Sequence, residues 1–279
     1  TVLCPAISYL ATAEAIKRTG AFIQFVDVNN KGLISQITDF GLPNALVYVN
    51  LFGNVADYEY LREYCDKRKI PLIEDAAQSL GSGYKNIPSG KLGDISSLSF
   101  APSKPLPCFG NGGMVLTDNE KERDYVRSIR YHATGTAKLE YGYNSCLPND
   151  HANILNFLLS KYTSLLSKTQ KVRDWYDHRL KDLGINSITT DSNTTSNNHK
   201  LVIKVNDRDN LKKFLESKKI ETQIHYTLPM SKMIMFHNEQ EMPNANKFCE
   251  QVLSLPIHPF LKKTEVEFVC KNIGDFYGF

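Results

Sequence analysis

Short apolar runs alternate with helical patterns through the first half of the chain, and this alternation restricts the possible folds strongly. Runs rich in β-branched and aromatic residues occupy residues 22–28, 46–50 and 71–73. Between them, residues 11–18 and 57–67 show the spacing of amphipathic helices. Alternation at such short intervals predicts an α/β fold, with a mostly parallel sheet and helices on both of its faces.

The second half of the chain predicts a smaller unit joined by a long helix. A helical pattern runs from about residue 149 to 183, after a polar loop at 131–147, and a Ser/Thr/Asn-rich connection follows at 189–198. We therefore expect a large domain at 1–165 and a small C-terminal α/β lobe at 166–279. The elements expected in the lobe are strands at 201–205 and 221–226 and helices at 210–217, at 244–253 and from residue 264.

Composition indicates an ordinary globular protein without a strong charge bias. The 279 residues carry 33 Lys+Arg and 30 Asp+Glu, a net charge of +3, and the basic clusters are short, so we expect no nucleic-acid partner. No apolar run approaches the roughly 20 residues of a membrane span. Six widely spaced cysteines without a CxxC pair suit reduced thiols in the cytoplasm better than disulfides or zinc ligands, and we expect no metal site.

Chemically reactive side chains concentrate in residues 72–118. The first apolar run there ends at Asp75, and Lys104 follows the second, which places an acid and a base where ligands bind open α/β sheets. Lys104 fits either a Schiff-base amine or a surface lysine, and Asp75 fits either a site carboxylate or a helix N-cap. The glycines at 110–113 precede a strand, so they predict a tight turn better than a phosphate-binding loop.

Several motifs in order resemble the DegT/DnrJ/StrS family of sugar aminotransferases, which use pyridoxal 5′-phosphate (PLP). The motifs are EDAAQS, SF-x-P-x-K and GNGGMVLTD, with further similarity in CPAISYLATAEAIKRTGAFIQFVDV, RSIRYHATG and SLPIHPFLKKTEVEFV. They span nearly the whole chain. The resemblance implies the aspartate-aminotransferase-like fold called fold type I.

The resemblance also implies a role for each matching residue. Lys104 would hold the cofactor covalently and move the proton during transfer, and Asp75 would pair with the pyridinium nitrogen. Further cofactor contacts implied are Tyr9 on the ring face, Gln78 near the ring hydroxyl, Ser99 at the phosphate and Asn144 from a dimer partner. Near the sugar substrate, the matching positions are His132, His225 and Tyr226, each of which also fits a structural role.

Two departures from the family pattern favour a rival interpretation. Members carry about 80 more residues before the position of Thr1, a part of the larger domain that includes a phosphate-binding Gly-Thr loop. Where members often have arginine, two residues after Asn144, this chain has Cys146. Losing both would weaken phosphate binding by several kcal/mol, at ~1.5–3 kcal/mol for each charged hydrogen bond. An N-terminally truncated, non-catalytic member or partner subunit with weak or no PLP binding is therefore the alternative.

The leading functional prediction is amino transfer, because a dehydratase branch of the family has histidine where this chain has Lys104. By the resemblance, glutamate would donate the amino group to a nucleotide-linked keto-sugar. The product would be an amino-sugar precursor of surface polysaccharide, such as lipopolysaccharide O-antigen. The same resemblance implies a homodimer. A flavodoxin-like nucleotide-binding module would explain the alternation but neither Lys104 nor the small lobe.

Overall fold

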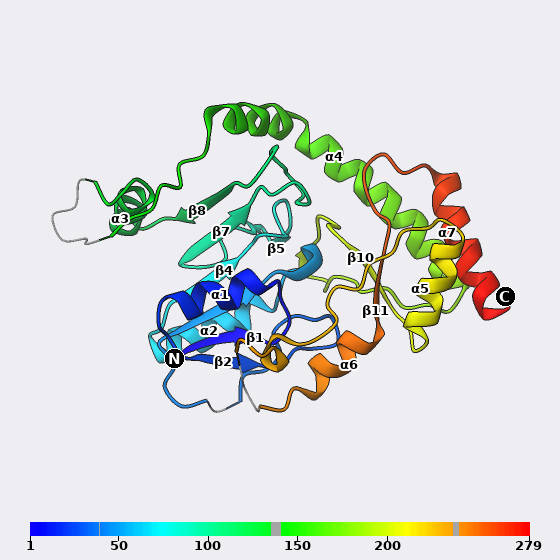
Figure 1. Cartoon of the computed structure of the whole chain (residues 1–279), viewed down its shortest axis with the longest axis horizontal. Helices are drawn as coiled ribbons and strands as arrows, with labels where there is room; N and C mark the ends of the chain where they lie inside the picture. The colour runs from blue at the N-terminus through cyan, green and yellow to red at the C-terminus, as the bar shows by residue number, and fades with distance from the viewer. Residues whose placement is uncertain (39, 135–140, 237–239) are drawn as a thin grey trace.

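The computed structural model describes residues 1–38, 40–134, 141–236 and 240–279, so part of the expected 131–147 loop lies outside the described residues. A six-stranded sheet organises the N-terminal half in the order β2-β1-β3-β4-β7-β8 (Figure 1). Its first five strands are parallel and β8 pairs antiparallel with β7. The predicted α/β class with a mostly parallel sheet is confirmed. The strands are β1 (Val2–Pro5), β2 (Ile23–Val26), β3 (Ala45–Val49), β4 (Leu72–Asp75), β7 (Ile95–Ser99) and β8 (Gly113–Thr117).

Helices follow these strands much as the sequence predicts. Helix α1 (Leu10–Arg18) contacts β1 and β2, and α2 (Tyr58–Arg68) contacts β4. A 3-10 turn, η1 (Leu51–Gly53), follows β3, and α3 (Glu120–Arg130) lies beside the edge strand β8 (Figure 1). Asn119 begins α3 by accepting hydrogen bonds from the first free amides of the helix, which stabilises that end.

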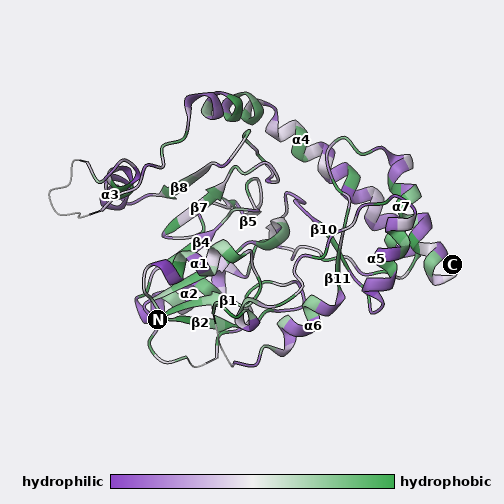
Figure 2. Cartoon of the chain, viewed as in Figure 1, coloured by the Kyte–Doolittle hydropathy of each residue, from purple (hydrophilic) through white to green (hydrophobic). Residues whose placement is uncertain are grey.

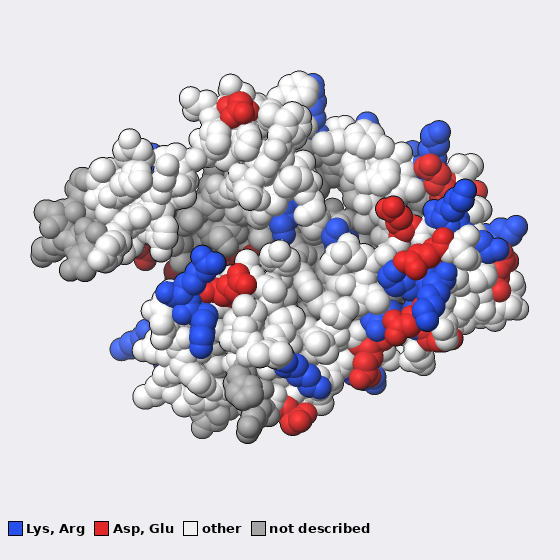
Figure 3. All heavy atoms as spheres, in the orientation of Figure 1, with Lys and Arg blue, Asp and Glu red and all other residues white. Residues whose placement is uncertain are grey.

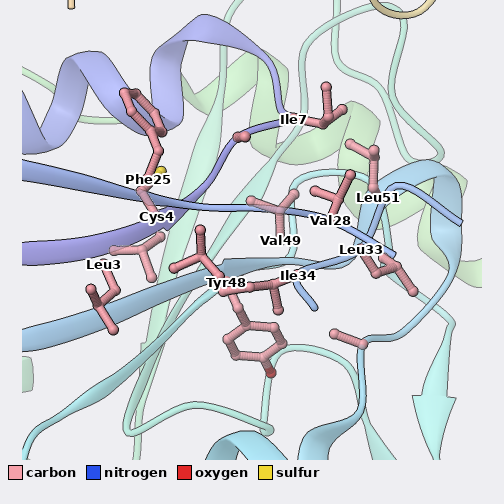
Figure 4. Packing of buried hydrophobic residues seen from close by; sticks show 14 of the residues in the cluster. Leu3, Cys4, Ile7, Phe25, Val28, Leu33, Ile34, Tyr48, Val49 and Leu51 are labelled. Carbon is pink, nitrogen blue, oxygen red and sulfur yellow. The ribbon is translucent and has the colours of Figure 1, made fainter. Parts of the chain in front are cut away.

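The main core lies between the sheet and its covering segments. Leu3, Phe25 and Tyr48 are completely buried, and Figure 4 shows Phe25 and Tyr48 pointing to opposite sides of the sheet. Hydropathy follows the same plan, with hydrophobic strands inside and helices that carry one polar face (Figure 2). A strand buried on both faces is apolar throughout, and this explains the continuous run ALVYV of β3.

One 34-residue helix, α4 (Asn149–Asp182), links the two halves of the chain. Its first part packs Leu155 and Tyr162 against Leu98 and Phe100 at the β7 end of the sheet. Its second part buries Tyr176 in a separate apolar cluster of the C-terminal lobe. The division expected between residues 165 and 166 falls inside this continuous helix, between the two clusters, and it stays a prediction.

The C-terminal lobe is a small α/β unit around two antiparallel strands. These are β10 (Leu201–Lys204) and β11 (Val252–Leu255), paired from Leu201–Leu255 to Lys204–Val252. Two further helices of the lobe are α5 (Arg208–Ser217) and α7 (Lys263–Tyr277), and α7 packs against both α4 and α5. The intervening elements η2 (Met230–Lys232) and α6 (Pro243–Gln251) bury Met230 and Phe248 in the main core instead.

Three predictions for the second half are wrong in detail. The helix expected at 244–253 ends at Gln251, because Val252–Leu255 is buried throughout and pairs as β11. Residues 221–226 make only one bridge, Gln223 to Ser254, before the chain turns toward the N-terminal sheet. The polar connection 189–198 contains β9 (Thr194–Thr195), which pairs with β5 (Gly83–Tyr84) of a short hairpin completed by β6 (Ile87–Pro88).

Within the described ranges, no helix combines the length and the apolar character that a membrane crossing requires.

Candidate active site

The carboxyl ends of the parallel strands gather the predicted cofactor residues at one edge of the sheet. Strand β4 ends at Asp75, β7 ends at Ser99, and Lys104 follows β7 by a short turn. Tyr9 stands just before α1, after β1, and its ring is exposed. Because neighbouring parallel strands run in the same direction, their carboxyl ends lie at one edge of the sheet. Residues far apart in sequence can therefore share one site.

The Asp75 carboxylate is held by two hydrogen bonds. Thr12 Oγ1 donates to Oδ2 at 2.7 Å, and the Ala77 amide donates to Oδ1 at 3.1 Å. Thr12 is itself buried and lies 2.8 Å from the Ser8 hydroxyl. The sequence interpretation missed Ser8 and Thr12 as supports of Asp75, because Ser8 lies before the first residue of α1 and only the fold brings Thr12 to the end of β4.

Lys104 has the properties of a reactive amine. Its side chain is largely buried, and this burial lowers its pKa, while the negative charge of Asp75 partly opposes the shift. Its Nζ makes no hydrogen bond or ion pair with any described residue. Because a lower pKa leaves more neutral amine near pH 7, Lys104 is better prepared for nucleophilic attack than a surface lysine.

Gln78 joins the edge of the sheet to the segment around His225 and Tyr226. Its Oε1 accepts from the Phe52 amide at 2.9 Å, and its Nε2 donates to the Tyr226 hydroxyl at 3.2 Å. Phe52 adopts φ 60° and stacks on the Tyr226 ring, with centroids 6.4 Å apart. Burial raises the pKa of Tyr226 to about 12, so its hydroxyl stays protonated and can donate to a ligand.

His225 lies near Lys104 and is kept neutral. Burial, together with the positive charges of Lys200 and Lys104, lowers its pKa to about 4. Its Nδ1 lies 2.9 Å from the Ser254 hydroxyl. His199 and Lys200 also belong to this group, since the same charges and burial push the pKa of His199 well below its ordinary value. The sequence interpretation missed both, because nothing in the polar run before β10 marks them.

The structure therefore brings Asp75, Gln78, Lys104, His225 and Tyr226 together. Ser99 is half-buried at the end of β7, where its Oγ accepts weakly from the Ala101 amide at 3.4 Å.

The two predicted residues beside α3 lie apart from this group within one chain. His132 is exposed, and its amide donates to the Tyr143 carbonyl at 2.9 Å. Asn144 is also exposed, and its backbone pairs with Tyr131 in an isolated bridge. Helix α3 lies on the outer side of β8, away from the C-terminal lobe (Figure 1). The roles assigned to His132 and Asn144 stay predictions.

The sequence and the fold agree on the class of protein. Residues 1–274 match the DegT/DnrJ/EryC1/StrS aminotransferase family. The structure resembles a DegT/DnrJ/EryC1/StrS aminotransferase of Brucella abortus, with a TM-score of 0.93, 27% identity and coverage of 100% of this chain and 79% of the other. It also resembles Streptomyces venezuelae DesV, solved in complex with a ketimine intermediate, with a TM-score of 0.92, 29% identity and coverage of 99% and 77%.

Two curated relatives carry more specific names. The chain is 31% identical to UDP-2-acetamido-2-deoxy-3-oxo-D-glucuronate aminotransferase of Pseudomonas aeruginosa, over 96% of this chain and 77% of the relative. It is also 31% identical to UDP-N-acetyl-3-dehydro-alpha-D-glucosamine 3-aminotransferase of Acidithiobacillus ferrooxidans, over 95% and 74%. The chain belongs to the DegT/DnrJ/EryC1/StrS family of sugar aminotransferases, whose members depend on PLP. The expected family and fold are confirmed, and these relatives give no support to the non-catalytic alternative.

Proposed function

We propose that this chain transfers the amino group of glutamate to the keto carbon of a nucleotide-linked sugar. The observation that carries the proposal is the convergence of a largely buried Lys104 and a fixed Asp75 at one edge of the sheet. The names of two relatives both specify a UDP-linked sugar oxidised at carbon 3. A UDP-linked 3-keto-sugar is therefore the first acceptor to test.

The residues present fit PLP as the cofactor. Asp75 offers a carboxylate whose position is fixed from two sides, as a pyridinium nitrogen requires, and Lys104 offers an unpaired amine for covalent attachment. Tyr9 offers an exposed aromatic face, Gln78 a polar side chain for the ring hydroxyl and Ser99 a hydroxyl for the phosphate. When bound, PLP supplies an electron sink for the charge that develops at the reacting carbon.

The protein's own task is to move a proton and to hold the substrates. The Lys104 amine would take the proton from the donor carbon that bears the nitrogen and, in the second half of the cycle, give a proton to the sugar carbon that receives the nitrogen. The carboxylate of Asp75, fixed by Thr12 and the Ala77 amide, would stabilise the protonated ring by its charge. Neutral His225 and the Tyr226 hydroxyl lie close by and would hydrogen-bond the sugar hydroxyls, with His132 as a further candidate.

The proposal also covers the oligomeric state of the protein, the use of its product and its location in the cell. Asn144 would reach the cofactor phosphate of a partner subunit in a homodimer, since within its own chain it lies beside α3. The product would serve the synthesis of surface polysaccharide such as lipopolysaccharide O-antigen. A cytoplasmic location rests on the widely spaced cysteines, none of which forms a disulfide within the described structure.

Absorbance and turnover test the proposal directly. Purified protein with added PLP should show a visible band from the covalently attached cofactor and should aminate a UDP-linked 3-keto-sugar with glutamate. Lys104→Ala should lose the band and at least about 10³-fold in turnover. The matched control is Lys91→Ala, because Lys91 is exposed and precedes β7, at the end of the strand opposite to Lys104. Full retention of the band in Lys104→Ala would refute the Lys104 assignment.

A panel of acceptors tests the substrate. The panel should contain keto-sugars linked to UDP, dTDP and GDP, the nucleotides that the names of relatives specify. Amination of at least one of them, with conversion of glutamate to 2-oxoglutarate, supports the proposal. Retention of the visible band without amination of any member would show that the cofactor assignment holds and the substrate class does not.

A further inference from the structure

Lys200 is a second cation at the active site, and the described residues offer it no partner. It stands directly before β10, partly buried, and its Nζ makes no hydrogen bond or ion pair among the described residues. Burial lowers its pKa, and the nearby charge of Lys104 lowers it further. A partly desolvated ammonium without a counter-ion is costly, so this position favours an anionic ligand.

Lys200 lines a cavity of about 590 Å³, which is within the range of small-molecule sites. Three segments that are distant in sequence form its walls, namely Lys200, residues 219–225 and residues 254–258. The bridge between Gln223 and Ser254 holds the last two together. In Figure 3, basic side chains lie within the hollow at the middle of the visible face.

The walls of this cavity are polar and incompletely hydrogen-bonded. His225 and Ser254 contact each other there, and His258 lies on the same lining. The Thr222 hydroxyl is buried without a hydrogen-bond partner among the described residues. Glu216 and Glu221 also line the cavity, and Glu216 is already paired with Lys212. The lining therefore combines acceptors and donors with the unpaired charge of Lys200, as a small zwitterion would require.

The amino donor needs a positive charge close to Lys104. Its amine would have to replace the Lys104 nitrogen on the cofactor carbon that Lys104 holds, and its α-carboxylate is attached to the same carbon as that amine. Lys104 itself must be neutral to react, and His225, with a pKa of about 4, carries no charge near pH 7. Lys200 and Lys104 are the cations that act on both His225 and His199, so Lys200 remains to supply this charge.

We propose that Lys200 binds a carboxylate of the amino donor, with the cavity formed by residues 219–225 and 254–258 beside it. The inference rests on the proposed aminotransferase function. It assigns Lys200 to the donor and not to the diphosphate of the acceptor, because the α-carboxylate is bonded directly to the reacting carbon of the donor, whereas the diphosphate of a 3-keto-sugar is attached two ring bonds away from the reacting carbon.

The half-reactions of Lys200→Gln separate the two substrates. Single-turnover absorbance with glutamate should show about 10- to 100-fold weaker donor binding, as expected for loss of a charged hydrogen bond. The half-reaction with the keto-sugar accepted by the wild type should change by less than about twofold. Lys200→Arg should recover most of the donor affinity, and Lys213→Gln, at an exposed position on α5 outside the cavity lining, should behave as wild type.

Binding without turnover provides an independent measurement. Calorimetric titration with glutarate, a dicarboxylate that lacks the amine, should show weaker binding to Lys200→Gln than to wild type, whereas titration with UDP should be unchanged. Equal glutarate affinity for both proteins, or a loss confined to UDP and the keto-sugar, overturns the assignment. If the wild type aminates no sugar, the proposed function fails while the glutarate titration still decides the role of Lys200.

Discussion

At the scale of single residues, the Ser8–Thr12–Asp75 chain shows how an unremarkable helix start positions a reactive group. Thr12 brings a buried hydroxyl to Asp75, and the hydroxyl of Ser8 lies within hydrogen-bonding distance of Thr12. The exposed Tyr9 lies between Ser8 and Thr12 in the sequence, so one short segment at the start of α1 would serve both the ring face and its nitrogen partner. We therefore regard Thr12 as a positioning residue for Asp75.

Replacing Thr12 tests this role. Thr12→Val keeps the shape of the side chain but removes a hydrogen bond to a carboxylate, which is worth about 1.5–3 kcal/mol. We expect PLP affinity, measured by absorbance titration, to fall about tenfold or more. Thr12→Ser keeps the hydroxyl and should restore the wild-type affinity. Equal weakening in both variants would indicate a packing role instead.

At the scale of elements, the buried Glu74 ties strand β4 to the turn that precedes β7. Its carboxylate is fully buried and accepts from Asn50, from the hydroxyls of Ser89 and Ser96, and from the amides of Gly90 and Leu92, at 2.6–3.0 Å. No cation takes part among these contacts. The carboxylate thus replaces water for several backbone and side-chain donors at once.

Removal of the Glu74 carboxylate should lower the stability of the fold more than it changes ligand binding. Glu74→Ala leaves these donors buried and unsatisfied, and each such group costs about 1–3 kcal/mol. We expect the free energy of unfolding, from denaturant titration, to fall by at least about 3 kcal/mol. Glu63→Ala on exposed α2, which removes only the surface pair with Lys67, should stay within about 0.5 kcal/mol. A loss below about 1 kcal/mol in Glu74→Ala would contradict this account.

The lowered pKa of His225 makes the stability of the folded protein depend on pH, and the direction of this dependence can be worked out. Its pKa is about 4 in the folded protein against an ordinary value of 6.5, so between these values the unfolded chain binds a proton that the native protein excludes. Stability therefore falls as pH falls from about 6.5 to 4, by at most about 3.4 kcal/mol at 1.36 kcal/mol per pKa unit. Unfolding measured across this range should show the fall in wild type and a smaller one in His225→Gln. His178→Gln, at an exposed position on α4, should keep the full wild-type dependence.

The elements differ in how well the sequence predicts them. Residues 120–130 and the strands of the parallel sheet follow from local pattern, because their periodicity and caps are intact. Residues 252–255 do not, since a short apolar run after a helix suits a strand or a further helical turn equally until β10 pairs with it. In the same way, Asp75 and Lys104 could be predicted from a motif, whereas Lys200 enters the site only through the packing of the lobe.

At the scale of the whole molecule, the candidate site is divided between regions that one chain does not bring together. Asn144 pairs with Tyr131 at the end of α3, a helix that lies outside β8 (Figure 1), whereas Lys104 is close enough to His225 to lower its pKa. Apolar side chains are exposed near that edge, among them Met114 and Val115 on β8 and Phe157 and Leu159 on α4. Exposed apolar side chains of this kind are typical of surfaces that bind another protein. Both observations support the proposed homodimer, in which Asn144 acts on the partner's site.

Subunit complementation tests this arrangement. Lys104→Ala and Asn144→Ala should each be nearly inactive alone. When equal amounts are mixed, unfolded together and refolded, half of the dimers carry one subunit of each kind, and each such dimer has one intact site. Activity should therefore recover to about a quarter of the wild-type value, as expected for random pairing around a two-fold axis. If Asn144 instead acts within its own chain, every site in the mixture lacks one group and activity stays at the level of the single variants.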